Sequence, residues 1–206
     1  MRVRTQERRD QIVEAAATLF EEVGYEAASM NELAKRLGGS KATLYGYFPS
    51  KESLLVAVVQ AFATDHLADA TQDVLQDIEG QCALRPTLVR FGERMLQVLT
   101  NDRSAIAIHS MILAEAGRSN VGQLFHDAGP SQSVAALTKL MAAAMERGEL
   151  HQTDPRITGM QFTALLTAEV TPRLYQQNPP PLEPAEIQQV VSRAVDMFLM
   201  GAQPRP

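Results

Sequence analysis

The sequence predicts an all-α protein, and three observations support that prediction. Apolar residues recur three or four positions apart through most of the chain, which is the period of an amphipathic helix. Convincing alternation of apolar and polar residues, which marks half-buried strands, does not appear. Prolines stand at or near the first positions of four predicted helices, where a missing N–H costs no helical hydrogen bond. With 45% hydrophobic and 21% charged residues, the chain has the composition of a globular protein.

The N-terminal region predicts two helices before the first glycine-rich turn. The first covers 5–23 and stops at Gly24, a favoured residue for ending a helix. Ser29 and Glu32 have the spacing of a capping box and begin a second helix of about two turns, which Gly38 interrupts. The apolar positions of these helices each form one stripe: Ile12, Val13, Ala16, Leu19, Phe20 and Val23 in the first, and Leu33, Ala34 and Leu37 in the second.

The stretch SKATLYGYFP predicts a third short helix. Ser40 is a candidate N-cap for a helix over 41–48, which Pro49 ends. Leu44 and Phe48 are four residues apart and can anchor one face of this helix in a core. A short capped helix, a glycine-containing turn and a second short helix form the helix-turn-helix pattern, whose second helix enters the major groove of DNA. The neighbouring hydroxyl and ammonium groups then have a use as phosphate contacts.

Motifs across about residues 8–55 resemble, in order and spacing, the N-terminal DNA-binding domain of the TetR/AcrR family of transcriptional regulators. The matching residues are Gly24, Tyr25, Ser29, Met30, Leu33, Ala34, Gly38, Ser40, Lys41, Ala42, Thr43, Leu44, Tyr45, Tyr47, Phe48, Ser50, Lys51, Glu52 and Leu54. The resemblance implies a three-helix helix-turn-helix DNA-binding domain over 1–50 and a C-terminal helical ligand-binding and dimerisation domain over 51–206, joined by a long fourth helix. It also implies a homodimeric repressor that a small molecule releases from operator DNA.

The resemblance assigns roles to individual residues by position. Ser29 and Thr43 look like phosphate-binding hydroxyls, and Lys41 resembles a residue that reaches a base edge or a phosphate. Tyr47 resembles the phosphate-contacting aromatic residue of the family, and Lys51 resembles the phosphate-binding lysine at the start of the connecting helix.

Ser40, Ala42 and Tyr45 complete the expected DNA-binding set. Several alternatives remain open for this set and its neighbours. Serines at helix starts could be caps and nothing more, and Tyr45 could lie mostly in the core. Lys35 and Arg36 could contact phosphates or remain solvated charges.

Three residues depart from the family pattern. Ala28 stands where a threonine hydroxyl is usual, and Gly39 replaces an apolar turn residue, which we expect to loosen the turn. Gly46 lies inside the recognition helix, where glycine costs about 1 kcal/mol relative to alanine and offers no side chain to a base. Direct readout is therefore expected to be sparse. Preference among operators could rest on Lys41, Ala42 and backbone positioning, or on arginines of the N-terminal arm in a minor groove.

The rest of the chain predicts further helices. One long helix is expected from Ser50 until Gly80, as a lever between head and body. The other expected helices cover 86–99, 102–116, 121–126, 130–147, 155–175 and 184–200. The last two are expected to form a four-helix dimer interface about a two-fold axis, through Phe162, Leu165, Leu166, Val191, Val195, Phe198 and Leu199.

Methionine and phenylalanine residues of the body could line an adaptable pocket for an apolar or amphipathic effector, although such residues at helical spacing also fit an ordinary core. The candidates are Phe62, Phe91, Met95, Met111, Phe125, Met141, Met145 and Phe162, with His66, His109, Glu115 and Glu169 as polar selectors.

Composition narrows the remaining classes of function. Cys82 is the single cysteine, and the four histidines lack metal-ligand spacing, so no metal, cofactor or catalytic group is expected. No apolar run reaches the length of a membrane span and no signal peptide is recognisable, so we expect a cytoplasmic protein. Up to Gln60 the charges balance, and the whole net charge of -5 falls on the remainder.

The expected partners are double-stranded operator DNA, a small-molecule effector and a second copy of the chain, with no membrane. Two alternatives stay open at this point. One is a DNA-binding regulator controlled without a small-molecule effector. The other is an all-α enzyme or adaptor whose head does not bind DNA.

Overall fold

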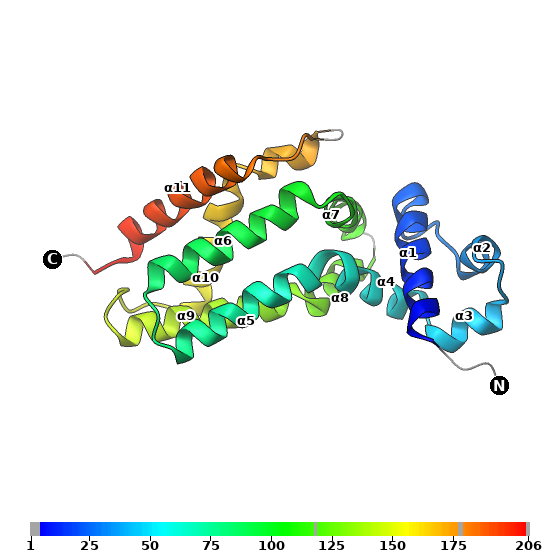
Figure 1. Ribbon diagram of the computed structural model, residues 1–206, viewed down its shortest axis with the longest axis horizontal. Coiled ribbons are helices and arrows are strands. Elements are labelled where there is room, and N and C mark those ends of the chain that lie inside the picture. The colour runs from blue at the N-terminus through cyan, green and yellow to red at the C-terminus, as the bar shows by residue number, and fades with distance from the viewer. Residues whose placement is uncertain (1–4, 118, 177–178, 205–206) are drawn as a thin grey trace. The chain divides into compact units, whose positions relative to one another are not determined.

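The computed structural model describes residues 5–117, 119–176 and 179–204, and only the backbone of residues 63–66, 174 and 175. Within these residues, eleven α-helices, one π-helical segment and one 3₁₀ segment make up the regular structure, and strands are absent, which confirms the all-α prediction. None of the described helices is long and apolar enough to span a bilayer. The chain forms two compact units (Figure 1), one from residues up to Asp65 with Ala107–Gly129, the other from His66–Ile106 with the residues from Pro130 onward.

The first unit contains the predicted head and a segment from the middle of the chain. Its helices are α1 (Gln6–Val23), α2 (Met30–Arg36), α3 (Lys41–Tyr47), α4 (Lys51–Val59), the second half of α7 (Arg103–Glu115) and α8 (Val121–Ala128). In this unit α1 packs against α2 and α4, α2 packs against α3, and α4 packs against α8. Ile108, Ile112 and Val121 join the apolar core of the head, so this core extends beyond the 50-residue domain expected from the sequence.

Caps account for where the head helices begin and end, and those at Ser29, Ser40, Ser50 and Gly24 were predicted. Thr5, Ser29, Ser40 and Ser50 are the N-caps of α1 to α4, and each side-chain oxygen accepts a hydrogen bond from a backbone N–H in the first turn. Gly24 ends α1 with a φ of 78°, a conformation that L-residues with a β-carbon rarely adopt. Local sequence chemistry therefore fixes the boundaries of these helices.

The stretch expected as one long helix contains a π-helical segment. The order is α4, then η1 (Gln60–Thr64), then α5 (Asp65–Glu79). A π turn accommodates one more residue than an α turn, so the side chains after it face a different direction from those of an uninterrupted α-helix. The boundary between the two compact units falls directly after this segment, at Asp65.

The second unit is built around α10 (Pro155–Ala168). This helix packs against α9 (Pro130–Glu146), α11 (Pro184–Ala202) and α6 (Leu84–Asn101). The structure ends α10 earlier than the expected 155–175, and a 3₁₀ segment, η2 (Thr171–Tyr175), follows it. Pro172 explains the difference, because a proline four residues past Ala168 cannot donate to a helical carbonyl.

Gly92 permits the close approach of α6 to its two neighbours. A β-carbon at this position would lie 2.8 Å from Leu166 Cδ2 of α10 and 2.9 Å from Val191 Cγ1 of α11. Both neighbouring side chains are fully buried in the core of the second unit, which leaves them little room to move.

We expect Gly92→Ala to lower the free energy of unfolding by about 1–3 kcal/mol, because overpacking outweighs the gain in helix propensity. Gly201→Ala is the matched control, since a β-carbon there would meet no atom within 4 Å in the same kind of helix. That control should be neutral or stabilising by up to about 1 kcal/mol. Urea unfolding of both variants measures the contrast, and an equal response of the two would contradict the close packing at Gly92.

Candidate nucleic-acid interface

The recognition helix α3 has a buried face and an exposed face. Leu44 and Phe48 lie in the core of the first unit with 2% and 3% of their surface exposed. Lys41, Ala42 and Tyr45 lie on the exposed side, and the Lys41 ammonium is 5.7 Å from the centre of the Tyr45 ring. Tyr45 is 41% exposed, so it is not a core residue. One continuous surface of α3 is thus available to a base edge or a phosphate.

Two serine hydroxyls of the expected DNA-binding set, those of Ser29 and Ser40, act as caps. Ser29 Oγ accepts a hydrogen bond from the Glu32 N–H at 3.1 Å, and Ser40 Oγ accepts one from the Thr43 N–H at 3.1 Å. The hydroxyls of Ser40 and Thr43 also share a hydrogen bond of 2.9 Å. The Ser29 hydroxyl therefore still has its own hydrogen to donate to a phosphate, and one of the Ser40 and Thr43 hydroxyl hydrogens remains for the same use.

Tyr47 connects the end of α3 with the start of α1. Its hydroxyl oxygen accepts a hydrogen bond of 3.1 Å from the Thr5 N–H. The phenol hydrogen stays available for a phosphate oxygen, as the resemblance expects. This bond also fixes Thr5, the first described residue, beside the end of the recognition helix. Arg2 and Arg4 of the N-terminal arm lie outside the described residues.

Arg8 supports the turn between α2 and α3. Its Nη2 donates to the Leu37 carbonyl at 3.0 Å, and its Nη1 donates to Gln11 Oε1 at 2.9 Å. Leu37 is the C-cap of α2, whose last carbonyls lack helical partners and carry partial negative charge. A β-carbon on Gly39 would lie 3.4 Å from Arg8 Nη2. The guanidinium therefore lies beside the position where the family pattern has an apolar side chain, and it ties the turn to α1.

The Lys51 ammonium points into the head. Lys51 Nζ lies 2.9 Å from the carbonyl oxygen of Tyr25 and 3.3 Å from those of Glu26 and Ala28, and it donates to all three. It also lies 4.3 Å from the centre of the Tyr25 ring. The structure thus gives this lysine internal partners where the resemblance expects a phosphate.

Three other cations of the head differ in what their side chains contact. Arg36 pairs with Glu22 at 2.6 Å and with Glu32 at 3.5 Å, and the hydrogen bond that it donates to Glu22 raises the pKa of Arg36. The guanidinium of Arg9 lies 5.3 Å from the centre of the Phe48 ring, so it covers a core residue of α3. Lys35 is an exposed residue of α2. The arginines thus contribute to the structure of the head, while Lys35 and Lys41 face solvent.

The residues expected for an effector pocket divide between the two compact units. Phe62, Met111 and Phe125 pack against the core of the first unit, with His109 stacked edge-on against Phe125 at 5.8 Å. Burial lowers the pKa of His109, which favours the neutral imidazole. Glu115 belongs to the same unit, and its Oε2 is buried without a hydrogen bond among the described residues. The side chain of His66 lies outside the described residues.

The other expected pocket residues belong to the second unit. Phe91, Met141, Met145 and Phe162 are core residues with at most 4% exposure, and Met95 packs against them. Glu169 pairs instead with Arg193 on the surface, at 2.6 Å, and that hydrogen bond lowers the pKa of Glu169. Within the described part of the second unit, these apolar side chains act as ordinary core.

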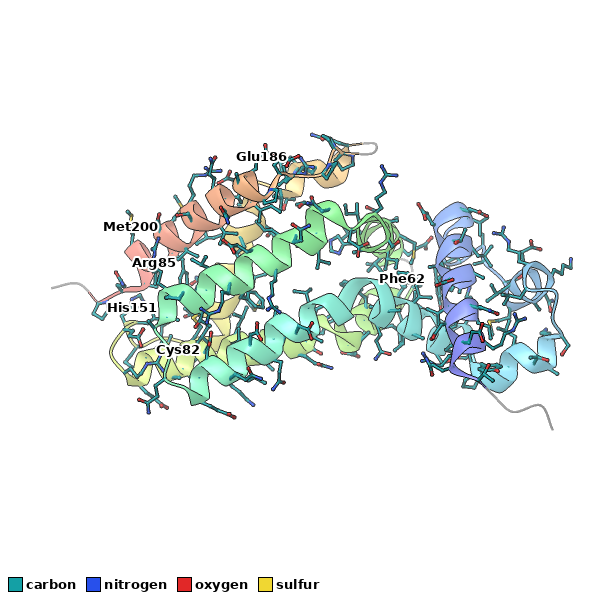
Figure 2. All side chains as sticks on the ribbon, viewed as in Figure 1. Phe62, Cys82, Arg85, His151, Glu186 and Met200 are labelled. Atoms are coloured by element: carbon teal, nitrogen blue, oxygen red, sulfur yellow. The ribbon has the colours of Figure 1, made fainter. Side chains whose placement is uncertain are left out.

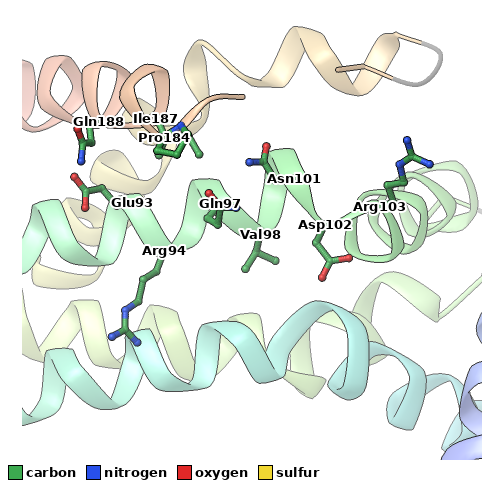
Figure 3. A pocket seen from close by; sticks show the side chains of 10 residues that line it. All are labelled: Glu93, Arg94, Gln97, Val98, Asn101, Asp102, Arg103, Pro184, Ile187 and Gln188. Atoms are coloured by element: carbon green, nitrogen blue, oxygen red, sulfur yellow. The ribbon is translucent and has the colours of Figure 1, made fainter. Parts of the chain in front are cut away.

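A groove of about 700 Å³ runs along α6 and α11 in the second unit (Figure 3). Glu93 on α6 and Gln188 on α11 face each other across it (Figure 3). Asn101, which also lines the groove, is hydrogen-bonded to the backbone of Leu182. The Asn101 side-chain amide donates to the Leu182 carbonyl at 2.9 Å, and its oxygen accepts from the Leu182 N–H at 2.8 Å. None of the eleven expected pocket residues whose side chains are described lines this groove. Its lining residues are Glu93, Arg94, Gln97, Val98, Asn101, Asp102, Arg103, Pro184, Ile187 and Gln188.

The residues expected for a dimer interface pack inside the chain's own core. Leu165 is partly buried there, and the others are at most 7% exposed: Phe162, Leu166, Val191, Val195, Phe198 and Leu199. The large apolar residues that α10 and α11 leave exposed are Ile157, Met160, Met197 and Met200. Met200 is 82% exposed and lies near the C-terminal end of α11 (Figure 2). Any surplus of apolar surface on these helices is therefore carried by different residues from those expected.

The internal contacts of Arg8 and Lys51 were not predicted from the sequence. Gly38 does signal the end of α2, where carbonyls need donors, and its φ of 59° confirms that ending. The choice of Arg8 as the donor depends on how α1 packs against α2, which residue spacing does not reveal. Among the described residues, groups of three or more side chains suited to hold a metal are absent.

Comparisons with known proteins place this geometry in a family. Residues 12–58 match the model of the tetR family of bacterial regulatory proteins, and residues 86–201 match the C-terminal domain of AefR-like transcriptional repressors. The solved structure of the flavonoid-responsive regulator FrrA is 29% identical, with a TM-score of 0.73 over 98% of this chain and 100% of that one.

Two curated relatives agree. The transcriptional activator FasR of Mycolicibacterium smegmatis is 36% identical over 85 residues, 41% of this chain and 39% of FasR. The A-factor receptor protein of Streptomyces griseus is 29% identical over 161 residues, 76% of this chain and 51% of the receptor. The chain thus spans about half or less of the length of these two relatives. Because a family model matches more than half of it, the chain belongs to the TetR family of transcriptional regulators.

Proposed function

We propose that this chain is a cytoplasmic, homodimeric repressor that a small apolar or amphipathic molecule releases from operator DNA. The observation that carries this proposal is the exposed face of α3, where Lys41, Ala42 and Tyr45 stand opposite the buried anchors Leu44 and Phe48. Such a face can enter a major groove without rearrangement of the head. The AefR-like repressor match over 86–201 supports repression.

The names of two relatives support control by a small molecule. FrrA is flavonoid-responsive, and the Streptomyces griseus relative is a receptor for A-factor. A ligand that binds better to one arrangement of the protein shifts the population toward that arrangement. We propose that this shift reaches the head along the continuous helical stretch of α4, η1 and α5. Two heads must lie about 34–36 Å apart, or a multiple of that, to enter successive major grooves, so a change in their spacing releases DNA.

We further propose that the outer surface of α10 and α11 forms the homodimer interface. The Phe162 and Phe198 rings lie 5.2 Å apart, and the His151 N–H donates to the Ala202 carbonyl. These contacts place the start of α10 near the end of α11, which brings exposed apolar residues of both helices to the same end of the pair. A shared apolar surface of this kind fits a second copy related by a two-fold axis.

Lys41→Ala should weaken binding to a preferred duplex by about 1–3 kcal/mol and change the ranking among sequences, because a base contact is lost. The duplex is selected from a random pool by the wild-type protein. Lys35→Ala on α2 is the matched control, and it should leave the ranking unchanged. Fluorescence anisotropy against the preferred duplex and single-base variants measures both effects. An unchanged ranking in Lys41→Ala would remove this lysine from the base-reading set.

The double variant Met197→Glu, Met200→Glu should weaken self-association at least about tenfold, since charges would replace apolar contacts. Leu113→Glu is the control, because Leu113 is 55% exposed and belongs to the other compact unit. Sedimentation equilibrium measures the association constant. A dimer that is equally strong in the double variant would place the interface elsewhere.

Reciprocal coupling tests the function as a whole. A panel of flavonoids is titrated into the full chain with and without a saturating amount of the selected duplex. A flavonoid that releases DNA should bind at least about fivefold more weakly in the presence of DNA, because linkage makes the two effects equal. Equal affinities in both titrations would exclude the coupling, and a complete lack of binding would exclude flavonoids as the ligand class.

A further inference from the structure

We propose that Lys51 is an internal latch that fixes the DNA-reading helices to the start of α4, and that it makes no phosphate contact. Lys51 is therefore a positioning residue for DNA binding. The inference rests only on the DNA-binding activity of the family, and it holds whatever the effector or the oligomeric state.

The Lys51 ammonium uses its full hydrogen-bond capacity within the head. A lysine ammonium has three N–H donors and no acceptor. In this head three backbone carbonyls surround Nζ, those of Tyr25 at 2.9 Å and of Glu26 and Ala28 at 3.3 Å. Each donor has a protein partner, so a phosphate oxygen could bind this group only by displacing a carbonyl.

The Lys51 ammonium also has an aromatic partner, the ring of Tyr25. Nζ lies 4.3 Å from the centre of the Tyr25 ring, within the range of a cation–π interaction. Tyr25 is 3% exposed, and its ring packs edge-on against Phe20 of α1 at 5.5 Å. Burial, followed by the charges of Glu52 and Glu26, raises the pKa of Tyr25 to about 12, so the phenol under the ammonium stays neutral. The latch is thus anchored in the core and not at the surface.

The place of these partners in the chain gives the latch its purpose. Tyr25, Glu26 and Ala28 form the connection between α1 and α2, and Ala28 directly precedes Ser29, the N-cap of α2. Lys51 is the first residue of α4, whose start is fixed by reciprocal hydrogen bonds between Ser50 and Ser53. The latch therefore joins the beginning of α4 to the beginning of the helix-turn-helix. A displacement of α4 would move α2, and with it the recognition helix that packs on α2.

The proposal also explains an absence in the sequence. The family pattern has a threonine where this chain has Ala28, which is 4% exposed. An alanine offers no hydroxyl to a phosphate at this position, while its carbonyl remains a partner for Lys51. In this chain the connection between α1 and α2 therefore binds the Lys51 ammonium.

Amine footprinting of the unmodified full chain tests the latch directly. Acetylation with a water-soluble reagent is followed residue by residue by mass spectrometry, with and without the duplex selected by the wild-type protein. In the free protein, Lys51 should react at least about tenfold more slowly than Lys35 and Lys41, and DNA should not change its rate. Rapid labelling of Lys51 in the free protein, with protection only when DNA binds, would overturn the proposal.

Two variants give an independent readout. In Lys51→Met the salt dependence of DNA binding should keep its slope, whereas loss of one phosphate contact lowers the slope by about 0.9. Amide hydrogens of the residues that connect α1 and α2 should exchange at least about tenfold faster in the free variant. Lys51→Arg should fail to restore this protection, because a planar guanidinium cannot direct three N–H groups at these carbonyls. Two results together would assign Lys51 to a phosphate contact. One is a lowered salt slope in Lys51→Met. The other is a Lys51→Arg variant that keeps full DNA affinity, the wild-type slope and normal amide exchange.

Discussion

The recognition helix is too short to be stable without tertiary contacts, and the organisation of the head follows from that constraint. α3 has seven residues, Gly46 among them, and helices this short are unstable in isolation. Burial of Leu44 and Phe48 supplies most of the missing stability, at about 1.5–3 kcal/mol for each fully buried side chain. The cap of Ser40 and the bond between Tyr47 and Thr5 then fix its two ends. The exposed face can remain small and polar because the opposite face is fully committed to the core.

The cations of the head follow the same logic. Arg8 binds a carbonyl at the end of α2, and Lys51 binds the carbonyls that follow α1. Positive groups are favourable at these places, since helix C-termini carry partial negative charge. Arg9 lies over a core ring, and Arg36 pairs with carboxylates. The head thus uses these four cations in internal contacts, while Lys41 and Lys35 lie on its described surface. Because few cations remain on the described surface of the head, we expect modest non-specific affinity for DNA.

Features that depend on neighbouring residues in the chain were predictable from the sequence. The caps at Ser29, Ser40 and Ser50 and the ending at Gly24 were expected and are observed, because each depends on a side chain and a backbone group within one turn. The all-α fold was also predictable from periodicity, whereas the expected division at residue 50 came from the family resemblance. Pro172 was a local signal that ends α10, but the apolar pattern that continues past it led to a longer predicted helix.

Features that depend on packing between distant segments were not predictable. Apolar periodicity identifies a buried face but not what covers it. Phe162 and Phe198 pack against one another within one chain, where an interface between chains was expected. The π-helical segment at Gln60–Thr64 leaves no signature in a continuous apolar stripe. A lysine next to a serine cap also has the same local sequence whether its ammonium faces a phosphate or three carbonyls.

On this account the head is fully formed before it binds DNA. Amide hydrogen exchange of α3 tests this most directly. In the free protein, the Leu44 and Phe48 amides donate to carbonyls one turn earlier, so both should be strongly protected. Saturation with a selected duplex should change that protection by less than about tenfold. Exchange of these amides at the rate of an unfolded chain until DNA is added would contradict the claim, because the recognition helix would then form only on binding.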